Sequence, residues 1–121
     1  MDILGKKSFA HVATVNADGT PQVTPVWVDY DGEHILINSA QGRKKDRNLR
    51  ANRAVAVSIQ DPDNPYRYLG VQGEIAEITE EGAVAHIHKL SNKYNGQDYP
   101  LTDDQVRVIY KIRPTRAWTM G

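Results

Sequence analysis

The sequence predicts a mainly β domain in which six or seven antiparallel strands form a small, closed or nearly closed barrel with one short and one longer helix. Several segments are rich in β-branched and apolar residues, as strands are. Two of the breaks between them hold the pairs Asp18-Gly19 and Asp31-Gly32, which are typical of tight hairpin turns. Only residues 43–52 and 80–94 have a helical pattern. Strands joined by tight turns pair antiparallel, and a sheet of this size loses its exposed edges by closing on itself.

The first third of the chain predicts an antiparallel meander. Residues 8–15, 22–30 and 33–39 are apolar or β-branched enough for strands, and the two Asp-Gly turns join them. Pro25 lies inside the second of these strands. Because proline has no backbone N–H to donate, we expect this position at a sheet edge, at a bulge, or where a ligand takes the place of a partner strand.

After the meander, strand-like and helix-like segments alternate. Leu49 is the main apolar anchor of the short helix, and Gly70 and Gly73 mark places for a bend or bulge in a long strand. Thr79 can cap the longer helix and Gly96 can stop it. The expected elements are a helix at 43–52, a strand at 54–60, a loop at 61–65, a strand at 66–78, a helix at about 80–94, and strands at 106–113 and 115–120.

Composition limits the class of protein. At 121 residues the chain is expected to be one domain, residues 1–121, with the apolar and charged fractions of an ordinary globular protein. Its formal charge is zero, whereas a dedicated nucleic-acid binder usually has a basic excess. The absence of cysteine excludes disulfides, thiolate catalysis and cysteine metal sites, and fits a cytoplasmic setting. No apolar run reaches membrane length, so we do not expect a membrane as partner. Because the net charge is zero, we do not expect a nucleic acid either.

The strongest functional signal is the basic segment at residues 43–50, where five of the eight residues are Lys or Arg. It follows a strand and opens a short helix, and cations beside free backbone N–H groups at a helix start favour a phosphorylated ligand. Lys45 lies on the same side of the helix as Leu49, so of the five cations it is the best placed to turn inward and contact a bound phosphate. Arg50 is the cation that we most expect to lie on the surface. The alternative interpretation is a solvated helix face.

The sequence shows no pattern of a catalytic or metal site. His86 and His88 are two residues apart on the longer helix and point in different directions, with no acidic ligand spaced to join them. Neither a Ser-His-Asp arrangement nor a pair of carboxylates stands out. We therefore predict no catalytic side chain and no metal. His11, Lys93 and Tyr94 are candidates only for contact with a substrate.

Several short motifs occur in an order that resembles a known family. They are FAHVAT at 9–14, DGTPQ at 18–22, TPVW at 24–27, GRKKDRNLR at 42–50, DPDNPY at 61–66, GEIAEI at 73–78, KYNG at 93–96, YP at 99–100 and IRP at 112–114 with Trp118. Together they resemble the pyridoxamine-phosphate-oxidase-like split β-barrel family, an FMN-binding-like fold, in its deazaflavin (coenzyme F420)-dependent oxidoreductase branch. Many members have a helix before the first strand, which this sequence does not predict.

The resemblance implies a homodimer that binds a flavin or deazaflavin across the subunit interface. A barrel this small is filled by its own side chains, so a cofactor would lie outside it and need a second subunit for burial. Carried over position by position, the implied cofactor-binding residues are Arg43 and Lys45 at the phosphate, with Lys44 and Asn48 adjacent; Thr24, Pro25, Val26 and Trp27 along the ring; Asn38 and Ser39 beside it; and Tyr66 and Tyr68 from the other side of the cleft.

The resemblance also implies a reaction: hydride transfer between F420 and a conjugated small-molecule acceptor, with the reactivity carried by the cofactor. Arg47 and Arg50 could extend a basic groove for the long glutamyl tail of F420, which favours the deazaflavin. The alternatives are an FMN-dependent oxidoreductase of the same fold and a non-enzymatic carrier of a flavin or deazaflavin. RNA contact by the helix at 43–52 is disfavoured by the zero net charge.

Overall fold

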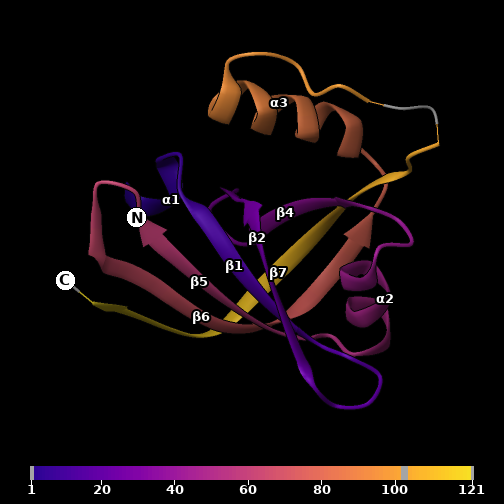
Figure 1. Cartoon of the computed structure of the whole chain (residues 1–121), viewed down its shortest axis with the longest axis horizontal. Coiled ribbons are helices and arrows are strands. Elements are labelled where there is room, and N and C mark those ends of the chain that lie inside the picture. The colour runs from indigo at the N-terminus through magenta and orange to yellow at the C-terminus, as the bar shows by residue number, and fades with distance from the viewer. Residues whose placement is uncertain (1, 102–103, 121) are drawn as a thin grey trace.

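Seven antiparallel strands form a single curled sheet in the computed structural model, which describes residues 2–101 and 104–120 (Figure 1). The strands are β1 (Phe9–Val15), β2 (Pro21–Trp27), β3 (Asp29–Tyr30), β4 (Ile35–Ala40), β5 (Ala54–Asp61), β6 (Asn64–Thr79) and β7 (Arg107–Met120). The helices are α1 (Asp2–Gly5), α2 (Lys44–Ala51) and α3 (Ala83–Asn95).

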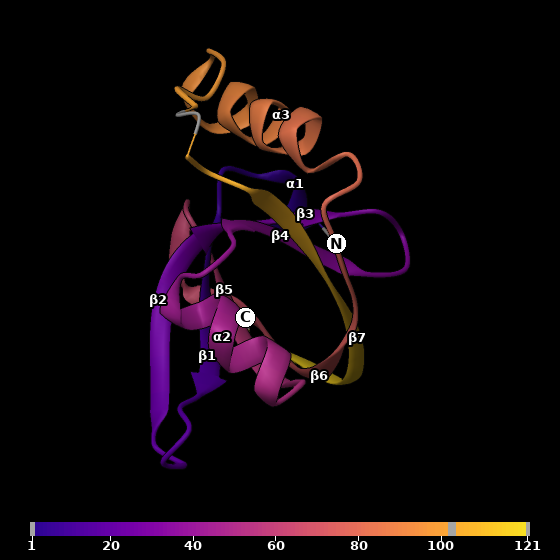
Figure 2. The same ribbon diagram turned by 90° about the vertical axis from the view of Figure 1, so that its right-hand side faces the viewer.

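The strand order β2-β1-β5-β6-β7-β4-β3 explains how the sheet curls into a split barrel. The strands β2 and β3 lie at opposite ends of the sheet although only Val28 separates them in sequence. The chain can pass directly between them because the two ends of the sheet lie close together, with β2 in contact with β4. Figure 2 shows the sheet curling around its interior, with α3 over one end. The predicted fold class is confirmed.

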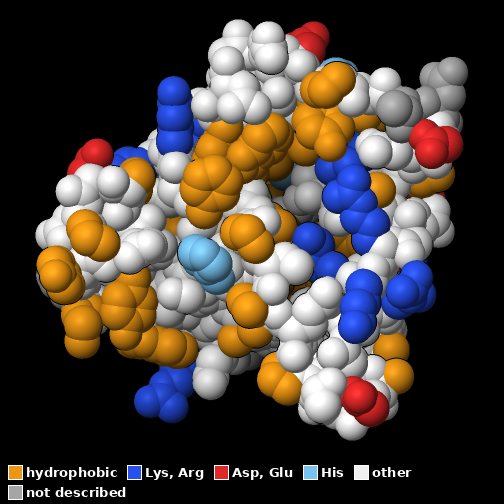
Figure 3. All heavy atoms as spheres, in the orientation of Figure 1, with side chains coloured by type: hydrophobic (Ala, Val, Ile, Leu, Met, Phe, Trp, Pro, Cys, Tyr) orange, Lys and Arg blue, Asp and Glu red, His pale blue; other side chains and the backbone are white. Residues whose placement is uncertain are grey.

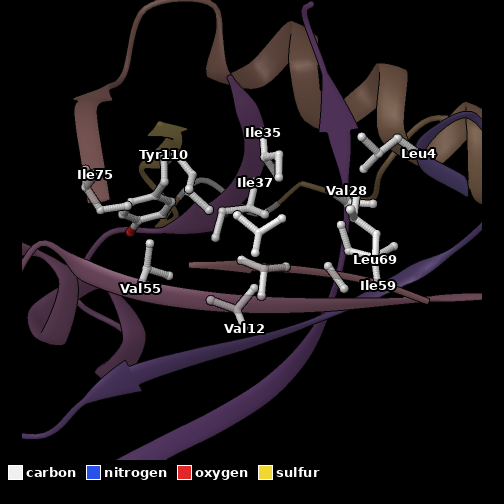
Figure 4. Close-up of a cluster of buried hydrophobic side chains, with 14 of the residues drawn as sticks. Leu4, Val12, Val28, Ile35, Ile37, Val55, Ile59, Leu69, Ile75 and Tyr110 are labelled. Carbon is white, nitrogen blue, oxygen red and sulfur yellow. The ribbon is translucent and has the colours of Figure 1, made fainter. Parts of the chain in front are cut away.

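The interior of the barrel is a continuous apolar core (Figure 4). Alternate residues of each strand point inward, so that Val12, Ile37, Ile59 and Tyr110 are fully buried. Burial of a side chain of this size stabilises the fold by about 1.5–3 kcal/mol each. These side chains fill the interior of the barrel, so we expect a cofactor to bind on its outside.

The second predicted strand is in fact two. Residues 22–30 were expected to run without a break, but β2 ends at Trp27 and β3 begins at Asp29. The backbone at Val28 leaves the partner β1 and joins the partner β4, and side chains of α3 bond its peptide groups instead. The expectation for Pro25 is confirmed, because β2 is an edge strand of the sheet.

The two longest strands also differ from the prediction. The strand β6 has a register shift against β7 between Gln72 and Gly73, as expected for a bulge at Gly73. Pro114 lies opposite Gly73 at this shift, where the missing N–H is tolerated, so the two predicted strands at 106–113 and 115–120 are one continuous strand. The pairing of β6 has no register shift at Gly70. Gly70 leaves room for the indole of Trp118, which lies against its Cα.

The expected loop at 61–65 is a tight hairpin turn, because β5 extends to Asp61 and β6 begins at Asn64. The turn is closed by side chains that replace backbone partners. A carboxylate oxygen of Asp61 accepts from the backbone N–H of Asp63 at 2.9 Å, and the amide oxygen of Asn64 accepts from that of Tyr66 at 3.1 Å.

The two predicted helices are present, with one shifted boundary. The helix α2 is one residue shorter at each end than expected, and its anchor Leu49 is fully buried. The helix α3 begins at Ala83 rather than near residue 80, and Thr79 does not cap it; its hydroxyl accepts from the N–H of Glu81 in the preceding turn. Gly96 ends α3 with a positive φ of 75°, as predicted.

The short helix α1 was not predicted. It precedes the first strand, and its residues Ile3 and Leu4 are buried in the barrel core. Four residues are too few for a recognisable helical period, so no pattern in the sequence indicates this helix.

A Gly73→Ala substitution tests the bulge. A Cβ at this position would lie 2.5 Å from the carbonyl oxygen of Arg113, which is backbone and cannot move aside. We expect a loss of about 1–3 kcal/mol in the free energy of unfolding, the usual cost of overpacking. The measurement is chemical denaturation beside Gly5→Ala, where a Cβ meets nothing within 4 Å. Equal stability of the two variants would contradict the assigned register.

Candidate functional site

A cleft of about 250 Å³ lies where β2, β4, the start of α2 and α3 meet. It has a cationic side and an apolar side. Six of the predicted site residues line it: Pro25, Val26, Trp27, Asn38, Arg43 and Lys45. The fold brings these six together from three separate segments of the sequence, as the resemblance implied for residues around one ligand.

Three cations form the cationic side: Arg43, Lys45 and Arg107. Burial of the Lys45 ammonium lowers its pKa, and the nearby charges of Arg43 and Arg107 lower it further. The ammonium has one marginal hydrogen bond, to the hydroxyl of Thr24 at 3.5 Å. In residues 2–101 and 104–120, no carboxylate forms an ion pair with Lys45. An anion in the cleft would therefore relieve the repulsion among these three groups.

Arg107 was missed by sequence reasoning. It opens β7, and its buried guanidinium donates from Nε to the amide oxygen of Asn38 at 3.0 Å and from a terminal nitrogen to Gln105 at 3.3 Å. Its guanidinium carbon also lies 5.1 Å from the ring centre of Tyr99. In residues 106–113 Arg107 reads as one of the polar residues on the outer side of a strand, and only the folded pairing of β7 with β4 brings it to the cleft.

The apolar side is built around Trp27. Its ring stacks on Tyr94 of α3 with 5.3 Å between ring centres and meets Tyr99 edge-on at 6.2 Å. Ile87 and Leu90 of α3 complete this side. Tyr99 follows α3 and was not predicted as a site residue. Flat apolar walls next to cations suit a ligand with a planar ring and an anionic tail.

The start of α2 is held by its own side chains. Gly42 precedes the helix with a positive φ of 89°, and its N–H donates to the carboxylate of Asp46 at 2.9 Å. Arg50 and the hydroxyl of Tyr110 also donate to Asp46. Arg47 donates to the carbonyl of Gly42 at 2.8 Å. Arg47 and Arg50 are thus engaged within the segment, which weakens the expectation that they extend a basic groove.

Three predicted residues near the cleft have other surroundings. The buried amide of Asn48 donates to side chains of the β1–β2 hairpin, at 3.0 Å to both Thr14 and Asn16, and so anchors α2. Ser39 lies on the face of β4 that carries Ile35 and Ile37, and its buried hydroxyl has no partner among the described residues. Lys44 is exposed and does not line the cleft.

The predicted aromatic pair lies elsewhere within one chain. Tyr66 is 82% exposed at the start of β6, and Tyr68 lines a hollow on the outer face of the sheet with His11 and Trp118. Neither ring lines the cleft. Their assignment to a cofactor stays a prediction that requires a second subunit.

The candidate substrate contacts Lys93 and Tyr94 instead attach α3 to the barrel. The ammonium of Lys93 donates to the carbonyls of Leu4 and Val28, at 2.9 and 3.2 Å. The hydroxyl of Tyr94 donates to the carbonyl of Ser8 and accepts from the N–H of Val28. These bonds hold the helix that covers the cleft.

The part of the chain that the structure describes contains neither a metal site nor a helix that could span a membrane. No group of three or more His, Asp or Glu side chains there is arranged to hold a metal ion. His86 bonds to Asp29, whereas His88 accepts from the N–H of Tyr99. The helices within residues 2–101 and 104–120 are also too short or too polar to cross a bilayer.

Comparison with solved structures supports the fold. A protein described as an F420 reductase is 42% identical, with a TM-score of 0.85 over 97% of this chain and 94% of that one. A conserved hypothetical protein from Mycobacterium tuberculosis is 25% identical, with a TM-score of 0.77 over 99% and 81%. General stress protein 26 from Bacillus anthracis, at 18% identity and a TM-score of 0.76 over 98% and 88%, shows the fold alone.

A search of curated proteins found no match. The sequence profile of the pyridoxamine 5'-phosphate oxidase family, by contrast, matches residues 1–121. That match spans the strands, α2 and α3 that build the cleft, and it agrees with the resemblance carried by the motifs. The chain belongs to the pyridoxamine 5'-phosphate oxidase family.

Proposed function

We propose that this protein is an oxidoreductase that uses coenzyme F420 to transfer a hydride to or from a conjugated small-molecule acceptor. The observation that carries the proposal is the cleft itself, where three cations face the aromatic wall of Trp27 and Tyr99. The family membership and the 42% identical F420 reductase support an oxidoreductase with a flavin or deazaflavin.

The cations fit the anionic part of such a cofactor. F420 carries a phosphate and glutamyl carboxylates, and FMN carries a phosphate. Lys45 and Arg107 are the two cations already drawn out of water, so an anion held by them gains charge-assisted hydrogen bonds at a small further cost of desolvation. Arg43 is exposed and adds charge from the rim.

The planar part of the cofactor fits the edge strand β2. Its outer side has no partner strand in the described chain, so peptide groups around Pro25 and Val26 can bond the polar edge of a heterocycle. Trp27 and the residues of α3 exclude water from this side. When bound, reduced F420 supplies a hydride from C5 of its ring. Reduction of the acceptor also takes up a proton, for which solvent suffices, and we assign no catalytic side chain.

A homodimer is part of the proposal. Large apolar side chains are exposed on the outer face of the sheet, among them Phe9, Val23 and Trp118. Figure 3 shows hydrophobic side chains over much of one face, with a group of Lys and Arg side chains on its right-hand side. A hollow on this face shares Phe9 and Pro25 with the cleft, so a second copy seated there would also cover the open side of the cofactor.

Titration with both cofactors tests the choice of F420. We expect F420 to bind more tightly than FMN, and pre-reduced F420 to be oxidised by a conjugated acceptor such as an enone or a quinone-like ring. The measurements are fluorescence titration and loss of reduced cofactor in the absorption spectrum. Tighter binding of FMN would reject F420 in favour of the FMN-dependent alternative. Binding without turnover across a broad panel of acceptors would favour the carrier.

Lys45→Ala tests the cationic side of the cleft. The variant should bind F420 more weakly by about 1–3 kcal/mol, the scale of a hydrogen bond to a charged group. Lys111→Ala is the matched control, because it removes the same charge from β7 at a site paired with Glu77 outside the cleft. Fluorescence titration measures both affinities. Equal affinities of the two variants would show that Lys45 is only a surface charge.

The dimer has its own test. Val23→Glu places a charge on the outer face, where the native side chain is 62% exposed, and should yield a species with the single-chain mass of 13.6 kDa. Val84→Glu is the control on α3, where the native side chain is 50% exposed away from this face. Light scattering after size exclusion measures the mass. A wild-type protein of single-chain mass would contradict the dimer.

A further inference from the structure

His86 is a buried side chain with no role in the proposed reaction. It lies on α3, is 8% exposed and does not line the cleft. Its ring nitrogens have two different neighbours. Nδ1 lies 3.2 Å from the amide nitrogen of Asn38 on β4, and Nε2 lies 3.1 Å from a carboxylate oxygen of Asp29 on β3. Asn38, in turn, lines the cleft and contacts Arg107.

Simple donor and acceptor chemistry fixes the direction of every bond in this group. The guanidinium of Arg107 can only donate, so the atom of Asn38 that lies 3.0 Å from its Nε must be the amide oxygen. The amide nitrogen of Asn38 then faces α3. One of its hydrogens meets the carbonyl of Ala83 at 2.8 Å, and the other is directed at Nδ1 of His86.

Nδ1 of His86 must therefore accept, and the ring proton sits on Nε2, where it can be donated to Asp29. The hydrogen bonds run head to tail from Arg107 through Asn38 and His86 to Asp29. The carboxylate at the end of this chain is the right acceptor, because the hydrogen bond from His86 holds the pKa of Asp29 well below its usual range. Such chains polarise their members and strengthen one another.

The charged and titratable groups around His86 agree with this direction. Asp29 faces it from β3, and Lys89 of α3 donates to the same carboxylate oxygen at 3.2 Å. Lys93 and Tyr94 of α3 interact with Asp29 only through space. A second proton on Nδ1 would point at the amide hydrogens of Asn38. Relief of that clash would require the amide to turn over and present its hydrogens to Arg107.

We infer that His86 is a positioning residue for the anion site: through the amide of Asn38 it fixes the guanidinium of Arg107 in the cleft. The neutral amide oxygen holds Arg107 without neutralising it, so its full charge stays available to an anion. A carboxylate at position 38 would hold the guanidinium equally well but cancel its charge. The inference rests on the proposed function only in taking the cleft as the place where a phosphate group binds.

The test uses inorganic pyrophosphate as the probe, which requires neither F420 nor turnover. Its affinity for the 121-residue protein is measured by calorimetry at constant pH and low salt. His86→Phe removes both ring nitrogens and should weaken pyrophosphate binding about fivefold, the effect expected from loss of one ordinary hydrogen bond. His86→Gln can accept from Asn38 and donate to Asp29, so it should stay within about twofold of the wild type.

A second arm separates positioning from a general loss of stability. The same His86→Phe change is made in an Arg107→Gln background. If His86 acts through Arg107, its effect on pyrophosphate affinity should vanish there, whereas a purely structural defect would persist. An equal loss in both backgrounds overturns the inference. Failure of the wild type to bind pyrophosphate overturns it as well, whatever the result with F420.

The third arm needs no variant and stands even when His86→Phe does not fold. Nitrogen-15 NMR of the wild-type imidazoles reports which ring nitrogen carries the proton. We expect His86 to show a protonated Nε2 and an unprotonated Nδ1. The opposite tautomer, or protons on both nitrogens at neutral pH, would overturn the inference. Because F420 is absent from all three arms, loss of the proposed cofactor leaves this result intact.

Discussion

Three positive groups are kept close together in a partly dehydrated cleft, and the proposed binding of a cofactor depends on them. Lys45 and Arg107 are drawn from water by α2 and β7, and the groups that hold them are neutral: a threonine hydroxyl, two amide oxygens and an aromatic ring. The carboxylates nearby are engaged elsewhere, with Asp46 tied to Gly42 and Arg50. The positive charge of these groups is therefore not cancelled by the protein. A phosphate group can form charge-assisted hydrogen bonds with them, and these bonds offset the cost of desolvating the cations.

The helix α3 links the barrel to this cleft. It closes the apolar side with Ile87 and Leu90. It is attached to the sheet by apolar contacts, such as those of Ala83 with Leu36 and Ile109, and by polar bonds from Lys93 and Tyr94. Those polar attachments end at backbone carbonyls and at Asp29. The position of the cations is therefore coupled to the docking of α3. Asn38, which contacts Arg107, also bonds to this helix at His86 and Ala83.

The sequence predicted those features that depend on local patterns. The hairpin of β1 and β2, the helix with Leu49, the edge position of Pro25 and the bulge at Gly73 all follow from residue type and spacing, whereas the expected meander of three strands is broken at Val28. The motif at 42–50 likewise pointed to Arg43 and Lys45. What could not be predicted depends on pairing across long sequence distances. Arg107 and Tyr99 enter the site only through the register of β7 on β4 and the fold-back after α3. Asn48 was predicted to contact the cofactor, whereas in the structure its amide nitrogen donates to Thr14 and Asn16 of the β1–β2 hairpin.

The most direct test of the central claim compares F420 with the same deazaflavin ring carrying its ribityl chain but no phosphate or glutamyl tail. If the cationic cleft binds the anionic part, intact F420 should bind at least about tenfold more tightly at low salt, and added salt should reduce that advantage. Equal affinity of the two compounds at low salt, or an advantage that salt does not change, would contradict the account.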